Sequence, residues 1–186
     1  EWLPADGFEA GLSLGGSLLS DNIEDYYVTP YDLGYGHMVK FDHDFVGREA
    51  LEAMKDKPHR KKVTLKWDKD DVIKVFASLF NDGDRFKYMD MPASHYATLP
   101  YDLVTKDGKS VGISHYPVYT SNVSGWISLA LLDESVAASG TDVSIRWGEP
   151  DGGSMKPTVE RHIQTEITAV VEHCPISVTA RENYKK

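Results

Sequence analysis

Alternating apolar and polar residues predict several β-strands from about residue 61 onward. The alternation covers residues 61–67, 143–147 and 163–171. A period of two directs apolar side chains to one face of a strand and polar ones to the other, so each segment should be a half-buried strand. The segment 125–132 is more continuously apolar, which predicts a strand that is buried on both faces or that closes a barrel.

The strongest local signal is a tight hairpin turn. Lys106-Asp107-Gly108-Lys109 lies between two strand-like segments, 103–105 and 110–113. An Asp-Gly pair favours the positive backbone dihedral angles that a two-residue turn between antiparallel strands requires. The two flanking segments should therefore pair as a hairpin.

Helical spacing of apolar residues occurs in two places. Residues 46–54 carry apolar side chains on one side and Arg48, Glu49 and Glu52 on the other, which predicts a short amphipathic helix. A second helix should begin at a cap formed by Asp68 or Asp70 and end near residues 81–83. Its apolar stripe, which should lie against the sheet, consists of Val72, Ile73, Phe76, Leu79 and Phe80.

Together these elements predict a mainly β chain with a few short helices, an α+β arrangement. Five or six short strands joined by turns favour a small antiparallel barrel or sandwich, because closure removes exposed strand edges. We expect a Greek-key barrel of about six strands in residues 59–186. Residues 1–58 lack strict alternation and should form an irregular connecting arm that carries the first helix. The glycine- and proline-rich segment 148–157 should be a long exposed loop.

Length and composition narrow the class of protein. The chain has 186 residues and begins Glu1-Trp2-Leu3-Pro4 without an initiator methionine, so we expect a piece of a longer polypeptide. No apolar run reaches the roughly 20 residues that would span a bilayer. The net charge of −9 argues against nucleic acid as a partner. The single cysteine, Cys174, excludes an intrachain disulfide and fits a reducing cytoplasm.

One cluster of basic residues runs against the negative net charge. It comprises Lys55, Lys57, His59, Arg60, Lys61 and Lys62. Such a cluster can be a solvated linker between two elements, or it can attract the anionic tail of a ligand.

Candidate chemistry is sparse when the residues are taken alone. The seven histidines are scattered, and the closest pair, His37 and His43, lacks the spacing of metal ligands, so we predict no metal site. Cys174 has no glycine-rich or helix-start context and should be a packed thiol. Flat aromatic rings with phenol groups suit a pterin or a substituted benzene ring, or they simply seal a domain interface. Such a group is formed by Tyr26, Tyr27, Tyr31, Tyr35 and His37.

Three motifs in order resemble the glycine-cleavage T-protein superfamily. They are Phe8-Glu9-Ala10-Gly11, the segment 29–41 from Thr-Pro-Tyr to Met-Val-Lys-Phe, and the segment 44–51 that reads Asp-Phe-Val-Gly-Arg-Glu-Ala-Leu. Downstream, Asp107-Gly108-Lys109 and later stretches resemble the C-terminal barrel of that family. Two further segments, 156–164 and 180–184, are similar to the aromatic O-demethylases that act on vanillate- or syringate-type methoxy groups.

The resemblance implies transfer of a methyl group from an aryl methyl ether to N5 of tetrahydrofolate. Such a reaction needs a proton donor for the departing phenolate and a pocket that aligns the methyl carbon with the pterin nitrogen. In the family most of these residues come from two upstream domains. We therefore expect no catalytic residue here, and a chain that is inactive on its own and works with those domains. Two alternatives remain open: a non-catalytic folate-binding module, and an aminomethyltransferase or sulfonium demethylase of the same superfamily.

The resemblance also implies cofactor-binding candidates. His37 stands where many family members place a tryptophan near the folate, and Tyr35 flanks it; the change to histidine puts stacking in doubt but leaves hydrogen bonding possible. Tyr31, Arg48 and Lys62 are further candidates. Our hypothesis is that the basic ones attract the glutamate tail of folate.

Overall fold

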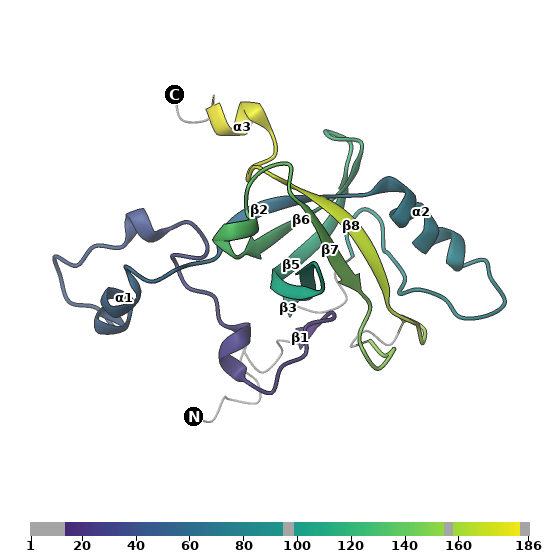
Figure 1. Cartoon of the computed structure of the whole chain (residues 1–186), viewed down its shortest axis with the longest axis horizontal. Coiled ribbons are helices and arrows are strands. Elements are labelled where there is room, and N and C mark those ends of the chain that lie inside the picture. The colour runs from purple at the N-terminus through teal and green to yellow at the C-terminus, as the bar shows by residue number, and fades with distance from the viewer. Residues whose placement is uncertain (1–13, 95–98, 155–157, 183–186) are drawn as a thin grey trace.

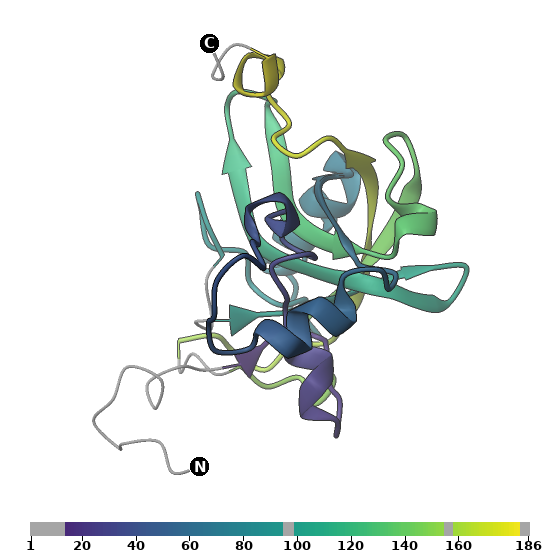
Figure 2. The ribbon, with the colours of Figure 1, turned by 90° about the vertical axis from the view of Figure 1, so that its left-hand side faces the viewer.

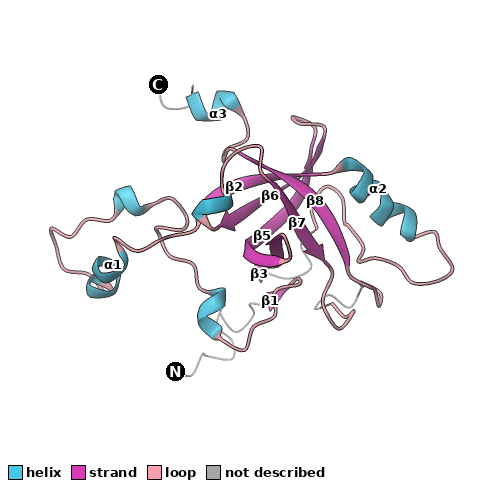
Figure 3. Ribbon diagram, in the orientation of Figure 1, coloured by secondary structure: helices cyan, strands magenta, loops and turns pink. Residues whose placement is uncertain are grey.

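Six antiparallel strands close into a barrel in this computed structural model, which describes residues 14–94, 99–154 and 158–182 (Figure 1). Around the barrel the order is β2-β6-β5-β4-β7-β8, and β8 pairs back onto β2. The six strands are β2 (Lys61–Trp67), β4 (Asp102–Lys106), β5 (Lys109–Thr120), β6 (Gly125–Leu132), β7 (Asp142–Trp147) and β8 (Thr165–Glu172). The predicted mainly β fold with an antiparallel barrel is confirmed (Figure 3).

The topology is a Greek key. Strands β4, β5 and β6 follow one another as neighbours, and β7 then returns to pair with β4. A fourth strand that lies beside the first of three consecutive strands defines this motif. The remaining elements are short: β1 (Leu14–Gly15) paired with β3 (Leu99–Pro100), the helices α1 (Arg48–Met54), α2 (Lys69–Ser78) and α3 (Val178–Glu182), and the 3₁₀ turns Ile23–Tyr26, Gly36–Met38 and Glu134–Val136.

The hairpin between β4 and β5 forms as predicted. Asp107 and Gly108 have positive φ angles of 50° and 74°, the values that the Asp-Gly pair supplies at low cost. Further along the hairpin the register shifts after Val104, opposite Gly112, whose φ is 151°. A Cβ atom at Gly112 would lie 2.2 Å from the carbonyl oxygen of Leu131 in β6. Glycine therefore lets two strands approach where the barrel bends.

The barrel interior holds three tryptophans. Trp67 packs edge-on against Trp147 at 5.6 Å between ring centroids and lies 6.1 Å from Trp126. Helix α2 covers one side, as Figure 1 shows: Asp68 caps it by accepting from the N–H groups of residues 70 and 71, and Val75 is fully buried. The predicted stripe was partly wrong, because Ile73 and Phe80 are exposed.

The arm packs on the outside of the barrel. Its residues Leu18, Tyr26, Val28 and Leu33 contact a second buried cluster formed by Tyr101, Ile113 and Leu131. Helix α1 and the loops beside it extend away from the barrel on the side opposite α2 (Figures 1 and 2). Helix α1 begins two residues later than predicted, and Val46 is fully exposed.

Two further predictions need correction. Residues 148–154 are no simple exposed loop, because Gly148 and Gly152 are buried and Glu149 is half-buried; residues 155–157 lie outside the described residues. Strand β8 begins at Thr165 rather than at Ile163, which instead forms a parallel bridge with Phe86. Both differences arise because the chain around residues 85–87 runs beside this segment.

Candidate functional site

Tyr31 holds the arm together. Its ring stacks on His59 with 4.6 Å between ring centroids, and its hydroxyl donates to the carbonyl of Leu51 in α1 at 2.9 Å. A Cβ at Gly36 would lie 2.6 Å from the Tyr31 ring, so the following turn folds tightly over it. Both the face and the hydroxyl of Tyr31 therefore have structural partners.

Tyr35 and Lys62 are brought together across the arm and the barrel. The Lys62 ammonium lies 4.7 Å from the centroid of the Tyr35 ring, a cation–π contact between the arm and β2. Tyr35 is 48% exposed, so much of its ring remains open to a ligand. The pair offers an accessible aromatic surface beside a positive charge.

His37 lies two residues beyond Tyr35, in the 3₁₀ turn Gly36–Met38. It is exposed, and its Nδ1 lies 3.2 Å from the carbonyl oxygen of Gly34, to which a protonated Nδ1 donates. The turn thus presents the imidazole to solvent with Nε2 directed away from that bond.

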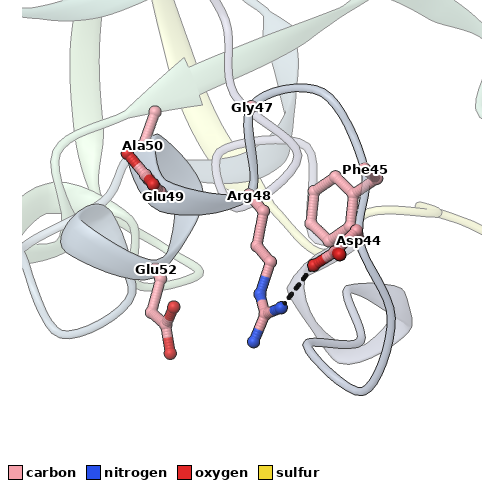
Figure 4. Close-up of a pocket in the computed structure, with 7 residues that line it drawn as sticks. All are labelled: Asp44, Phe45, Gly47, Arg48, Glu49, Ala50 and Glu52. Carbon is pink, nitrogen blue, oxygen red and sulfur yellow. Dashed lines mark hydrogen bonds and ion pairs between the residues drawn. The ribbon is translucent and has the colours of Figure 1, made fainter.

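Arg48 lies in a separate pocket at the start of α1 (Figure 4). Its guanidinium donates to Asp44 at 2.9 Å, and Glu49 and Glu52 line the same pocket. The lining of this pocket carries three carboxylates and one guanidinium, and this net negative charge opposes the approach of an anion. The structure therefore does not join Arg48 to Tyr35 and Lys62 in one positive site.

The side chains of the basic stretch 55–62, which runs into the start of β2, make separate contacts. Lys55 and Lys57 are exposed, Lys61 pairs with Glu134 at 2.6 Å, and the Arg60 backbone N–H donates to Asp32 at 3.0 Å. The hydrogen bond and charge of Lys61 hold the pKa of Glu134 below its usual range. Lys62 is thus the member of this stretch that faces an open aromatic ring.

A buried group of ionisable residues was missed by the sequence analysis. Lys87 Nζ donates to Glu149 Oε1 at 2.6 Å, and His162 Nε2 lies 3.0 Å from Glu149 Oε2. The side chains of Lys87 and His162 are 2% and 1% exposed. Asp102 lies next to them and is 1% exposed. We call Lys87, Asp102, Glu149 and His162 the polar cluster.

The polar cluster anchors the start of the described arm. The N–H of Gly16 donates to Glu149 Oε1, and the N–H of Ser17 donates to Asp102 Oδ1, each at 3.2 Å. The Ser17 hydroxyl donates to the carbonyl of Arg146 at 2.6 Å and accepts from the N–H of Leu103 at 2.8 Å. Gly16 fits only without a side chain, because its φ is 90° and a Cβ would lie 2.4 Å from the Tyr101 carbonyl oxygen.

The environment shifts the pKa values of the two carboxyl groups of the polar cluster in opposite directions. Burial raises the pKa of Asp102 to about 7, against the lowering effect of Lys87. Burial alone would also raise the pKa of Glu149, but hydrogen bonds from His162, Lys87 and the Gly16 N–H, with the charge of Lys87, lower it to about 2. The Glu149 carboxyl is therefore ionised near neutral pH, whereas the Asp102 carboxyl can hold a proton there.

Two further residues with shifted pKa values, His115 and Tyr101, lie where the arm meets β5. His115 and Tyr101 meet edge to face with 4.5 Å between ring centroids. Burial and the nearby Arg60 charge lower the pKa of His115 to about 4, and burial and Tyr116 raise the pKa of Tyr101. Both rings are therefore uncharged near neutral pH.

Sequence signals for the polar cluster existed but were weak. Lys87 and Asp102 are each flanked by aromatic or apolar neighbours, as Phe86-Lys87-Tyr88 and Tyr101-Asp102-Leu103. Charged residues inside such segments are rarely buried without a partner. The partners come from distant segments, so the sequence could indicate burial without naming the pairs.

Within the described residues, no three His, Cys, Asp or Glu side chains are arranged to hold a metal ion. Cys174 is a free, half-buried thiol, in agreement with the prediction of a packed residue. Across the same described segments, every helix is too short or too polar to cross a bilayer.

Comparisons with curated proteins identify relatives. The chain is 48% identical over 184 residues to a syringate O-demethylase of Sphingobium sp., an alignment that covers 99% of this chain and 40% of that protein. It is 37% identical over 137 residues to a sesamin methylene transferase of Sinomonas sp., covering 68% of this chain and 30% of that protein. No family model matches the chain. The chain thus spans less than half the length of the relatives it matches.

The identity to the first relative extends over nearly the whole chain, barrel and arm alike. The arm motifs and the barrel therefore point to the same relatives. The chain belongs to the glycine-cleavage T-protein superfamily, in the group that contains the syringate O-demethylase.

Proposed function

We propose that this chain is the C-terminal part of a tetrahydrofolate-dependent enzyme that removes methyl groups from methoxylated aromatic compounds. The observation that carries the proposal is the 48% identity, over 99% of the chain, to a syringate O-demethylase. Tetrahydrofolate, when bound, would accept the methyl group at N5. Upstream domains would supply the proton donor and the substrate pocket, so the 186-residue chain should lack activity by itself.

Among the described residues, Tyr35 and Lys62 fit the tail of a folate better than its pterin ring. The tail has a benzoyl ring followed by glutamate carboxylates. An exposed tyrosine ring can stack on the first, and a lysine ammonium can donate to the second. His37 would border this site from the turn Gly36–Met38, and Tyr31 would support it through its contacts with His59 and Leu51. Arg48 would contribute only if Asp44 released it.

Replacing Lys62 tests the tail contact. In the full-length enzyme, we expect Lys62→Ala to weaken binding of triglutamyl tetrahydrofolate about tenfold, because a charge-assisted hydrogen bond is lost. Binding of the monoglutamate should change less. The matched control is Lys69→Ala, an exposed lysine in α2 on the other side of the barrel. Calorimetric titration measures both.

Unchanged affinity in both Lys62→Ala and Arg48→Ala would dispose of the tail contact but leave the methyl-transfer proposal intact. That proposal has its own test. The full-length enzyme should form 5-methyltetrahydrofolate and a free phenol from syringate or vanillate. If it instead used dimethylsulfoniopropionate or an aminomethyl donor, it would be another member of the superfamily. A full-length protein that binds folate without forming 5-methyltetrahydrofolate from any of these donors would be a binding module.

A further inference from the structure

Arg60 directly precedes β2 and lines a pocket of about 700 Å³. Its backbone N–H donates to Asp32 at 3.0 Å, which fixes the main chain at this point. Within the part of the chain that the structure describes, its guanidinium forms no hydrogen bond or ion pair, although Arg60 is half-buried. Such a partly desolvated guanidinium gains charge-assisted hydrogen bonds when an anion binds to it.

The carboxylates of this pocket are not bonded to that guanidinium. Both oxygens of Asp32 accept hydrogen bonds from backbone N–H groups or a hydroxyl. Glu134 pairs with Lys61 at 2.6 Å, and Asp133 is exposed to solvent. Three cations therefore stand against three carboxylates around the pocket, namely Arg60, Lys61 and Lys62 against Asp32, Asp133 and Glu134. An incoming anion has no ion pair to displace here, whereas it would have to displace Asp44 from Arg48 (Figure 4).

Arg60 and Lys62 lie in a row on the arm side of the barrel. In an extended chain, residues two positions apart point to the same face and are separated by about 7 Å. Lys62 lies over the Tyr35 ring of the arm. The charge of Arg60 acts on His115 and on Tyr101, which the arm covers, and both of these rings are uncharged near neutral pH. Neither ring therefore neutralises Arg60.

We propose that Lys62 and Arg60 bind successive carboxylates of an oligoglutamate tail, so that this site favours folates with two or more glutamates over the monoglutamate. The inference rests on the proposed function, because it takes a folate as the ligand beside Tyr35. A tail that stacks its benzoyl ring on Tyr35 meets Lys62 first and reaches Arg60 only when it is longer. Attachment at Arg60 also holds the tail over Lys62, since the second contact is then intramolecular. Loss of Lys62 consequently affects a long tail more than a short one.

Binding of tetrahydrofolates with one, two and three glutamates to the full-length enzyme tests the proposal. We expect the affinity to rise about three- to tenfold from the monoglutamate to the diglutamate, the range between an exposed ion pair and a good charge-assisted hydrogen bond. The third glutamate should add less, because Lys61 is already paired with Glu134. Calorimetric titration measures the ratio of the affinities. Equal affinity for the three lengths would overturn the proposal, and 5-methyltetrahydrofolate formation from the monoglutamate, assayed on the same protein, reports on the proposed function separately.

Variants show whether Arg60 reads the second glutamate. Arg60→Gln should bring the ratio of diglutamate to monoglutamate affinity close to one, and Arg60→Lys should keep part of it. The matched control is Lys66→Gln, an exposed cation further along the same face of β2, which should keep the wild-type ratio. An unchanged ratio in Arg60→Gln, or an equal loss of affinity for every tail length, would refute the assignment.

The salt dependence of the wild-type enzyme decides if Arg60→Gln does not fold. A preference that comes from ion pairing should decline toward a ratio of one as the salt concentration rises, because exposed charges are screened. A preference for the diglutamate that is insensitive to salt would contradict a contact between carboxylate and guanidinium.

Discussion

Glu149→Gln should lower the free energy of unfolding by about 2 to 3 kcal/mol, because a neutral amide replaces the carboxylate that bonds the buried side chains of Lys87 and His162. Lys87 is 2% exposed, and its 2.6 Å bond to Glu149 Oε1 cannot be replaced by water without opening the site. The glutamine keeps the shape of the side chain, so the loss reports charge rather than a cavity. Urea denaturation followed by circular dichroism measures it.

Glu166→Gln is the matched control. Glu166 pairs with Arg146 at 3.0 Å between β8 and β7, but the two side chains are 49% and 40% exposed. An exposed pair contributes at most about 1 kcal/mol, and salt screens it. Similar small losses in the two variants would mean that the buried Glu149 carboxylate contributes no more to stability than the exposed Glu166 carboxylate does. Adding Lys87→Met to Glu149→Gln should recover part of the lost stability, because no buried ammonium remains.

Gly112→Ala should cost at least about 2 to 3 kcal/mol, since it combines an unfavourable φ with overpacking. The new Cβ would lie 2.2 Å from the Leu131 carbonyl oxygen and 2.9 Å from the Leu132 Cα, both backbone atoms of the paired strand. Neither can move away without breaking the ladder between β5 and β6. Thermal unfolding should show a lower midpoint and a loss of cooperativity.

Gly125→Ala provides the comparison in the next strand. Gly125 begins β6 with no positive φ, and its nearest neighbour to an added Cβ is the Val123 carbonyl oxygen at 3.7 Å. We expect a change within about 0.5 kcal/mol. If Gly112→Ala were as mild as Gly125→Ala, the close approach of β5 and β6 would not limit the barrel.

Local patterns were sufficient to predict the barrel. The alternation of residues 61–67 matched β2 at both ends, and Asp107-Gly108 placed the first hairpin. These signals work because strand faces and turn angles are set by neighbouring residues. The α2 stripe failed at Ile73 and Phe80 because burial depends on which face of a helix meets the sheet, and that is decided by tertiary packing.

The candidate site was less accessible to sequence reasoning. Motif resemblance selected Tyr35 and Lys62, and the structure places them in contact. It also selected Arg48, whose acidic neighbours Asp44 and Glu52 become relevant only when the helix folds. The sequence analysis did not predict the polar cluster, because its four side chains lie in four separate segments. No local pattern records a pairing such as Lys87 with Glu149, 62 positions apart. The division of the chain at residue 58 stays a prediction.

The tryptophans of the barrel give the protein a built-in optical probe. Trp67, Trp126 and Trp147 are all at most 4% exposed and pack against one another, whereas the described arm contains tyrosine and no tryptophan. Their emission should stay blue-shifted while the arm opens or closes and shift to red only when the strands separate. Emission from these three tryptophans therefore reports on the strands of the barrel and not on the described arm.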